Sequence, residues 1–410
     1  VGSMNHQSFF STKLRTTRKL AGVLVSVMAL GAASPLSAVT TRWSTPTRAA
    51  TAIGPVLDVT CSATVCWAST YRGLLSSTNG ETFNSTNSAF AQSVAGMWCD
   101  SLSAKCVSVD QLGGTFVSST SGATWNPAKS GTVVATTLKA ITREMMTLDL
   151  ECSTAVGCIL ASPSASRGNN TAPIFFAPWS GAGLGTWTLA KNVSGAENHL
   201  ACTASGVCFA NTSTGATYRS TNGGAGWELA TNLPTTSWLV TGSTVQTSTN
   251  CLVGTESCIS VSIQQVLTGL APSSYRFMIY ATNDGGATWE VKSSGTGNVI
   301  AMSISCATTS HCVRSSISVV SSTPLSFGTT TETSSDFGAT WSSSTNGDAT
   351  QVVCPSTTRC FSFTDLLMGF ILSASNDIDQ ISLSTTSDFT TWTSVMPQGT
   401  FVVADVQCAS

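Results

Sequence analysis

The sequence predicts an all-β fold made of repeated four-stranded sheets, and two interleaved repeats carry that prediction. The first repeat is a pair of cysteines five to seven positions apart, which occurs seven times in the 410 residues. The second is a short turn that ends in an aromatic residue, as in the segment from Thr282 to Trp289, and one such turn follows each cysteine pair. The intervening chain alternates apolar and polar residues and is punctuated by Gly, Ser and Asn, a pattern typical of strands and hairpins.

Each unit of about fifty residues provides four short strands. The first strand leads into the first cysteine, the second leaves the second cysteine, the third runs into the turn, and the fourth leaves from its aromatic residue. Four-stranded sheets at this period are typical of the blades of a β-propeller. A closed ring also removes the open edges that a linear array would expose. We therefore predict a seven-bladed β-propeller over residues 57–410, preceded by an N-terminal segment at 39–56 that could close the ring.

The cysteine pairs are expected to be disulfides that clip the first hairpin of each blade. Zinc needs four converging ligands, whereas consecutive pairs would lie on different blades. Each bridge would close a loop of six to eight residues and contribute about 2 kcal/mol. The expected bridges join Cys61 to Cys66, Cys99 to Cys106, Cys152 to Cys158, Cys202 to Cys208, Cys251 to Cys258, Cys306 to Cys312 and Cys354 to Cys360. Cys408 is the fifteenth cysteine, and truncation, a ring-closing strand or an intermolecular bridge could each account for it.

The best copies of the turn run from Ser220 to Trp227, from Thr282 to Trp289 and from Ser334 to Trp341. This motif resembles the Asp-box, or BNR repeat, of sialidases, sortilin-type receptors and photosystem II assembly-factor propellers, and the paired cysteines resemble secreted bacterial BNR-repeat proteins. The resemblance implies a structural role for Asn222, Trp227, Asp284, Trp289, Asp336 and Trp341. Weaker copies end at Phe83, Trp125, Trp187 and Trp392, with the acid position at Thr78, Thr120, Ala182 and Asp388.

Residues 1–38 are expected to be a removable leader. Residues 1–3 read as an expression remnant, and a basic stretch at 13–19 followed by an apolar run at 20–33 is typical of a secretory signal. An uncleaved membrane anchor is the alternative, although a run of about 14 residues is shorter than the roughly 20 needed to span a bilayer. We expect a secreted or extracytoplasmic protein, with no membrane span in the mature chain.

Composition excludes some function classes. Removing the four basic residues of the leader leaves 14 basic against 20 acidic residues, a net charge of about −6. Nucleic acid is therefore not an expected partner, because phosphate binding needs clustered Lys and Arg. Only three histidines and four tyrosines are present, and the Arg-Ile-Pro motif that opens sialidase propellers is absent. We expect no metal, no cofactor and no catalytic residues.

The sequence thus favours a binding or interaction module for a protein or a surface glycan. A glycoside hydrolase of sialidase-like type and an extracytoplasmic assembly or scaffold factor are the alternatives. Both repeats should lie at one end of the blades, which leaves the longer loops at the other end for the ligand. The residues expected to line that ligand face are Lys139, Arg143, Arg167, Asn169, Tyr275, Arg276 and Phe370.

Overall fold

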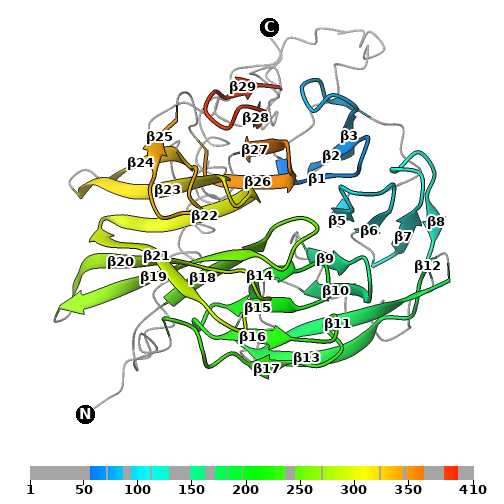
Figure 1. Ribbon diagram of the computed structural model, residues 1–410, viewed down its shortest axis with the longest axis horizontal. Coiled ribbons are helices and arrows are strands. Elements are labelled where there is room, and N and C mark those ends of the chain that lie inside the picture. The colour runs from blue at the N-terminus through cyan, green and yellow to red at the C-terminus, as the bar shows by residue number, and fades with distance from the viewer. Residues whose placement is uncertain are drawn as a thin grey trace, which may run out of the picture. The chain divides into compact units, whose positions relative to one another are not determined.

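The computed structural model divides the chain into two compact units, residues 1–51 and 52–410, and every described residue belongs to the second. The described residues are 56–70, 73–85, 94–110, 113–128, 148–161, 171–181, 183–195, 197–235, 245–268, 271–322, 325–344, 349–363 and 383–395. They contain strands and no helix, and the strands form seven antiparallel sheets (Figure 1). This confirms the prediction of an all-β, seven-bladed propeller.

Every blade is built from strands that follow one another along the chain. Blade 1 comprises β1 (Val56–Cys61), β2 (Cys66–Thr70), β3 (Gly73–Ser77) and β4 (Asn84–Ser85). Blade 2 comprises β5 (Val94–Cys99), β6 (Cys106–Asp110), β7 (Thr115–Ser118) and β8 (Asn126–Pro127). Blade 3 comprises β9 (Asp149–Ser153), β10 (Gly157–Ala161), β11 (Thr171–Ser180), β12 (Gly183–Leu184) and β13 (Thr188–Ser194).

The last four blades have the same order of strands. Blade 4 comprises β14 (Glu197–Cys202), β15 (Cys208–Thr212), β16 (Thr217–Ser220) and β17 (Glu228–Leu229). Blade 5 comprises β18 (Val245–Cys251), β19 (Cys258–Thr268), β20 (Ala271–Thr282) and β21 (Glu290–Gly297). Blade 6 comprises β22 (Val299–Thr308), β23 (His311–Ser322), β24 (Leu325–Ser334) and β25 (Ser342–Ser343). Blade 7 comprises β26 (Gln351–Ser356), β27 (Arg359–Phe363), β28 (Leu383–Thr386) and β29 (Thr393–Ser394).

Blade 3 departs from the expected four strands. Its third strand, β11, pairs with both β12 and β13, so the sheet has five strands. The segment expected to form an aromatic turn, from Ser180 to Trp187, contains strand β12 instead. Its sequence has alanine at position 182, where the better copies have an acid or amide that can accept backbone hydrogen bonds.

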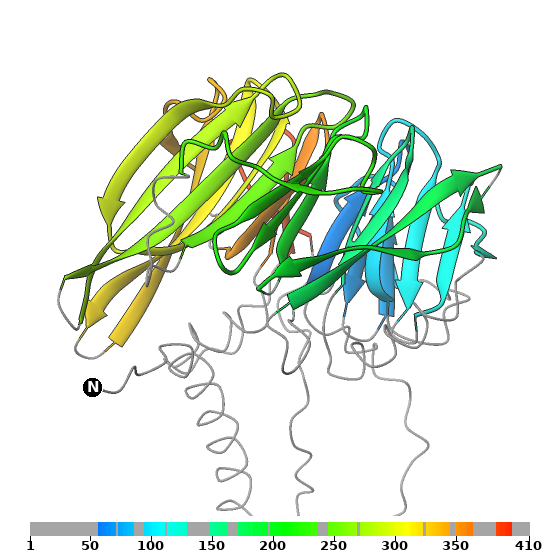
Figure 2. The same ribbon diagram turned by 90° about the horizontal axis from the view of Figure 1, so that it is seen from below.

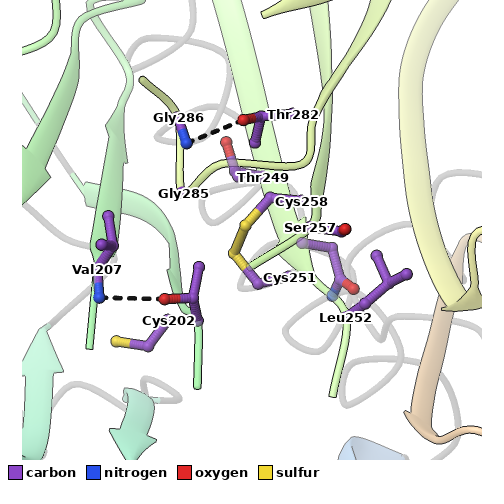
Figure 3. Close-up of a disulfide and its surroundings, with 12 residues drawn as sticks. Cys202, Val207, Thr249, Cys251, Leu252, Ser257, Cys258, Thr282, Gly285 and Gly286 are labelled. Carbon is purple, nitrogen blue, oxygen red and sulfur yellow. Dashed lines mark hydrogen bonds between the residues drawn. A yellow bond between two sulfur atoms is a disulfide. The ribbon is translucent and has the colours of Figure 1, made fainter. Parts of the chain in front are cut away.

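The seven predicted disulfides are all present, which confirms the pairing. Each joins the end of a blade's first strand to the start of its second, as Figure 3 shows for Cys251 and Cys258. The turn between these two cysteines is closed by backbone bonding, since Leu252 N–H donates to Ser257 O over 2.8 Å. Cys408 lies outside the described residues.

In three blades the strands do not begin where the sequence placed them relative to the bridge. We expected each second strand to leave from the second cysteine, but β10, β23 and β27 begin one residue earlier, so their second residues are Cys158, Cys312 and Cys360. The reason is that strand pairing continues past the bridge into the turn. Beyond the bridged cysteines lie the further pairs Ser153 with Gly157, Thr308 with His311, and Ser356 with Arg359. The bridges of Cys158 to Cys152, of Cys312 to Cys306 and of Cys360 to Cys354 are nevertheless the predicted ones.

The core lies between the blades. Side chains alternate across a strand, so in six blades the apolar residue two positions before the first cysteine points into this interface. These residues are no more than 5% exposed: Val59, Met97, Leu150, Leu200, Ile304 and Val352. The inter-blade core therefore follows the same repeat as the disulfides.

The first strands of consecutive blades contact one another and form the inner ring. Contacts run from β1 to β5, β9, β14, β18, β22 and β26, and β26 in turn contacts β1, which closes the ring. An apolar cluster fills this seam between blades 7 and 1, including Val56, Val59, Phe361, Phe363 and Leu383. Phe83 adds an edge-on contact with Phe361 at 5.9 Å between ring centroids.

The open edge of an inner strand needs partners for its backbone N–H groups. In four places a side chain of the preceding blade accepts the bond. The pairs are Cys99 N to Thr60 Oγ1 (2.9 Å), Leu200 N to Asp149 Oδ2 (2.6 Å), Val352 N to Ser303 Oγ (3.1 Å) and Cys354 N to Ser305 Oγ (2.9 Å). Neighbouring blades are thus linked by directional bonds as well as by apolar packing.

None of the described residues forms a helix able to cross a membrane.

Candidate functional site

The aromatic turns are held by a repeated set of hydrogen bonds. In blade 5, Thr282 Oγ1 donates to Asp284 Oδ1 over 2.7 Å and accepts the Gly286 N–H over 2.9 Å, as Figure 3 shows for the second bond. Asp284 also accepts the N–H and the hydroxyl of Thr288, at 2.9 and 2.6 Å. Gly285 and Gly286 take positive φ values of 63° and 75°, which glycine adopts without strain.

These bonds fix the charge state of the turn carboxylates. The hydroxyl and N–H of Thr288 lower the pKa of Asp284 to about 2, and Thr340 does the same for Asp336. Asn222 makes the equivalent bond from Oδ1 to Gly226 N–H at 2.8 Å without a charge. Because their oxygens are used inside the turn, these residues are poorly placed to act on a ligand.

Two weaker copies follow the same plan with a shifted register. In blade 1 the bonds are made by Asn79, which accepts N–H groups from Glu81 and Thr82 at 2.9 Å, and not by the expected Thr78. In blade 7, Asp388 accepts the N–H groups of two threonines that follow it. Both turns are one residue shorter than the copy in blade 5, so alignment of the sequences alone misplaced the first of them.

The turn aromatics pack against the neighbouring blade. Trp227 is 6% exposed, and its Nε1 donates to Gly224 O over 2.8 Å. Trp341 makes the same bond to Gly338 O over 3.1 Å. Trp289 packs edge-on against two aromatic rings, Phe209 and Tyr280, at centroid distances of 5.6 and 5.2 Å.

The disulfides and the aromatic turns share one end of the blades. In blade 1, Cys66 pairs with Cys61 on one side and with Ser77, where the turn begins, on the other. We name this end the turn face and the opposite end, where second and third strands connect, the loop face. Of the residues expected on the loop face, Tyr275 and Arg276 are described and are adjacent on β20. The others lie outside the described residues: Lys139, Arg143, Arg167, Asn169 and Phe370.

Blades 5 and 6 extend much further toward the loop face than blades 1, 2 and 4. Their second and third strands have 10 to 12 residues, against 4 or 5 in those three blades. Figure 2 shows these long strands in yellow-green and yellow. In the extension, Arg276 Nε donates to Gln264 Oε1 across the hairpin.

Side chains lock the two long blades together. Tyr275 and Phe277 pack with the apolar cluster shared by blades 5 and 6. The Arg314 guanidinium lies 4.5 Å from the ring centroid of Trp341 and forms a 2.7 Å ion pair with Glu332. Blades 5 and 6 are therefore packed against each other through a shared apolar cluster.

A second arrangement lies on the inner strands, where Asp58, Asp149, Glu151 and His199 form what we name the axial cluster. His199 Nδ1 is 3.3 Å from Asp149 Oδ2, and Asp58 Oδ1 accepts the Val59 N–H over 2.7 Å. The side chains of His199 and Asp149 are 32% and 22% exposed, so solvent reaches them although protein surrounds them closely.

Three groups of the axial cluster, Asp58, Glu151 and His199, have raised pKa values. Burial, and then the charge of Asp149, raises the pKa of Asp58 to about 6. Burial also raises the pKa of Glu151 well above its usual value, with Asp149 and Asp58 adding to the effect. For His199, burial opposes protonation, but the hydrogen bond that it donates to Asp149 and the charges of both aspartates raise its pKa overall. The environment of the cluster therefore favours the protonated forms of Asp58, Glu151 and His199.

Sequence reasoning missed this cluster, although its signal was present. Three of the four residues occupy one position, three before the first cysteine of a blade, and Glu151 lies two further along on the same side of its strand. A comparison of the residues three before the first cysteine in all seven blades would have identified Asp58, Asp149 and His199 as neighbours. Among the described residues, no group of three His, Cys, Asp or Glu side chains is arranged to hold a metal ion.

Two pockets lie outside the axial cluster. One of about 280 Å³ lies on the turn face among the hairpins of blades 7, 1 and 2 and is lined by Arg359, Asn79 and several hydroxyl side chains. The other, of about 500 Å³, lies between blades 2 and 3 beside Pro127, Pro178 and Leu184.

No family model matches the chain, and no curated protein matches it in sequence. Among solved structures it is similar to the GH74 xyloglucanase from Xanthomonas campestris, with a TM-score of 0.48 and 11% identity over 83% of this chain. That match covers 54% of the xyloglucanase, about half its length. It is also similar to YCF48 from Cyanidioschyzon merolae, with a TM-score of 0.46 and 11% identity over 76% of this chain and 92% of that one. Similarity at this level assigns no function.

The described chain is thus a disulfide-clipped seven-bladed β-propeller. Its seven bridges indicate an oxidising, extracytoplasmic environment, because cytosolic thiols are kept reduced.

Proposed function

We propose that this protein is a secreted propeller of the Asp-box type that binds a protein or surface glycan through its loop face. The observation that carries the proposal is the joint extension of blades 5 and 6, whose strands share an apolar cluster that Tyr275 and Phe277 pack against. Recognition surfaces are commonly carried by extensions of a rigid scaffold. The repeated turn bonding supports the Asp-box assignment, and the disulfides together with the leader pattern support secretion.

Tyr275 and Arg276 are the described residues that test the binding face. We expect the double variant Tyr275→Ala, Arg276→Ala to lose at least tenfold in affinity for any glycan that the wild-type protein retains on a glycan array. The control is Glu228→Ala, which removes an exposed charge on the turn face. Loss of binding in the control with retention in the double variant would place the ligand on the turn face and reject the proposal.

A glycoside hydrolase is the second candidate, and the axial cluster is the observation that favours it. A carboxyl with a raised pKa beside a second carboxylate can act as a general acid. Release of reducing sugar from a panel of polysaccharides, abolished by Glu151→Gln in a folded variant, would establish this activity. Absence of turnover across the panel, together with binding on the array, would leave the binding module as the function.

A further inference from the structure

In a short blade the antiparallel fourth strand ends opposite the residue where the third strand begins. In blade 2 the N–H of Ala128, which follows β8, donates to the carbonyl of Thr115, the first residue of β7, over 2.8 Å. In blade 4, Ala230 makes the same bond to Thr217, the first residue of β16, over 2.9 Å. The fourth strand therefore covers the full outer edge of the third.

Blade 6 breaks this rule. The equivalent bond runs from Ser344 N–H to Thr331 O at 3.0 Å, yet β24 begins six residues earlier, at Leu325. The fourth strand, β25, pairs only with Glu332 and Thr333. Among the residues that the structure describes, the stretch from Leu325 to Thr330 is thus paired on one side only, with β23.

In blade 5 the fourth strand pairs with the extended part of the third strand. Its third strand, β20, is equally extended, but β21 follows it outward and pairs from Ala281 as far as Tyr275, opposite Gly297. The outer half of β21 has the sequence Ser293-Ser294-Gly295-Thr296-Gly297, which is uncharged. One polar, extended segment is therefore enough to complete a blade of this length.

The direction of the free backbone groups follows from strand alternation. Residues of one parity in an antiparallel strand face one neighbour, and the others face the opposite neighbour. Because Thr331 and Thr333 face β25, Phe327 and Thr329 direct their N–H and C=O groups to the same, outer side. The stretch has no charged residue and no proline, which are the usual means of protecting an edge strand from pairing.

We infer that the outer edge of β24 captures an extended segment of a partner protein, which continues the two-residue fourth strand β25 along the stretch from Leu325 to Thr330. This inference rests on the proposed binding function and makes its ligand a polypeptide. Main-chain hydrogen bonds would provide affinity, and alternate side chains of the ligand would meet Phe327 and Thr329.

Other occupants fit the geometry less well. Six residues span about 20 Å, so pairing of this edge between two copies would bury far less than the roughly 1,200 Å² of a stable dimer. Only four residues join Ser344 to Ala349, whose carbonyl accepts the hydroxyl of Ser315 on β23. That connection is too short to run out along the edge to Leu325 and return.

Hydrogen exchange of the wild-type monomer tests whether the edge is free. We expect the amides of Phe327 and Thr329 to exchange rapidly and that of Thr330, which faces β23, to be protected at least a hundredfold more. Equal protection in a monomer would show that the protein's own chain covers the edge. Protection that grows with protein concentration would show that a second copy does. Either result would overturn the inference.

Peptide selection tests the ligand. The probe is a phage-displayed library of random decapeptides, selected on the full-length wild-type protein. The affinities of the selected peptides are then measured for the wild type, Thr329→Pro and Thr329→Val. The proline removes one outward N–H without breaking the ladder to β23, whereas valine keeps it. We expect selected peptides to bind wild type and Thr329→Val equally, to bind Thr329→Pro at least tenfold more weakly, and to slow exchange at Phe327.

The outcomes separate this inference from the function it rests on. Peptides that bind all three proteins equally, or a library that yields none, would reject strand capture. Glycan binding that depends on Tyr275 and Arg276 would then leave the loop-face module standing with a carbohydrate ligand. Glycan binding that is lost in Glu228→Ala and kept in the Tyr275→Ala, Arg276→Ala variant would reject binding through the loop face, whatever the peptide selection shows.

Discussion

The axial cluster predicts an unusual pH dependence of stability that can be tested with one substitution, Asp58→Asn. The pKa of Asp58 rises from 3.8 to about 6 on folding, so the folded state binds more protons than the unfolded state between these values. The stabilising contribution is therefore fully present below pH 3.8 and is lost as pH rises through about 6. A shift of this size corresponds to a cost of about 3 kcal/mol at pH 7 and above, as an upper limit because solvent reaches the cluster.

Asparagine removes the charge and keeps an oxygen for the Val59 N–H. The variant should therefore be about 2 to 3 kcal/mol more stable than the wild type at about pH 8, on the same linkage argument, and should match it near pH 4. The raised pKa values of Glu151 and His199 act in the same direction, so the wild type should lose stability as the pH rises above 3.8, and these two groups should add to the loss that Asp58 causes. Urea unfolding at several pH values across this range, with the disulfides intact, measures both effects.

The control for this series is Asp100→Asn, which changes a carboxylate on the turn-face hairpin of blade 2. This variant makes the same carboxylate-to-amide change at a position outside the axial cluster. A difference between Asp58→Asn and wild type that stays constant from about pH 4 to pH 8 would refute the argument, because it would mean that Asp58 titrates alike in both states.

Three further substitutions test the repeats. Trp227→Ala should cost about 3–5 kcal/mol in urea unfolding, as the loss of a buried aromatic side chain does, and an unchanged midpoint would contradict its packing role. Asp284→Asn should cost less than about 1 kcal/mol, because Asn222 accepts the equivalent hydroxyl and N–H bonds in blade 4 and only the exposed bond from the Thr288 hydroxyl would be lost; a loss above about 2 kcal/mol would show that the charge itself is needed. The double change Cys251→Ser, Cys258→Ser should cost about 2 kcal/mol, and no change in the free energy of unfolding would contradict the loop-closure argument.

The fold could be predicted because its signals are local and repeated. A cysteine pair specifies a tight hairpin, and Asp284 with its following glycines specifies a tight turn, whatever the rest of the chain does. Seven copies of both leave little choice of architecture. The local prediction failed where a copy of the turn departs from the pattern. In blade 1 the turn bonds are made by Asn79 and not by the expected Thr78, and in blade 3 the expected turn contains strand β12.

The candidate sites depend on information that no local pattern contains. Asp58 and His199 are far apart along the chain and meet only because the ring brings β1, β9 and β14 together. Their pKa shifts arise from that proximity and from burial, both of which are tertiary. The open edge of β24 was equally hidden, since it depends on how far β25 pairs rather than on any residue type.

The apolar seam that closes the ring has a mechanical consequence. Within a blade, a shearing load is shared by backbone hydrogen bonds and limited by a covalent bridge. At the seam between blades 7 and 1, the described contacts are side-chain packing around Val59 and Phe361 and an ion pair between Arg359 and Glu81 at 3.7 Å. Tension applied across blades 1 and 7 should therefore part this junction first and turn the ring into an open arc. Each disulfide would then reduce the length to which the unfolded chain can be stretched. The residues between its two cysteines cannot be extended while the bridge is intact.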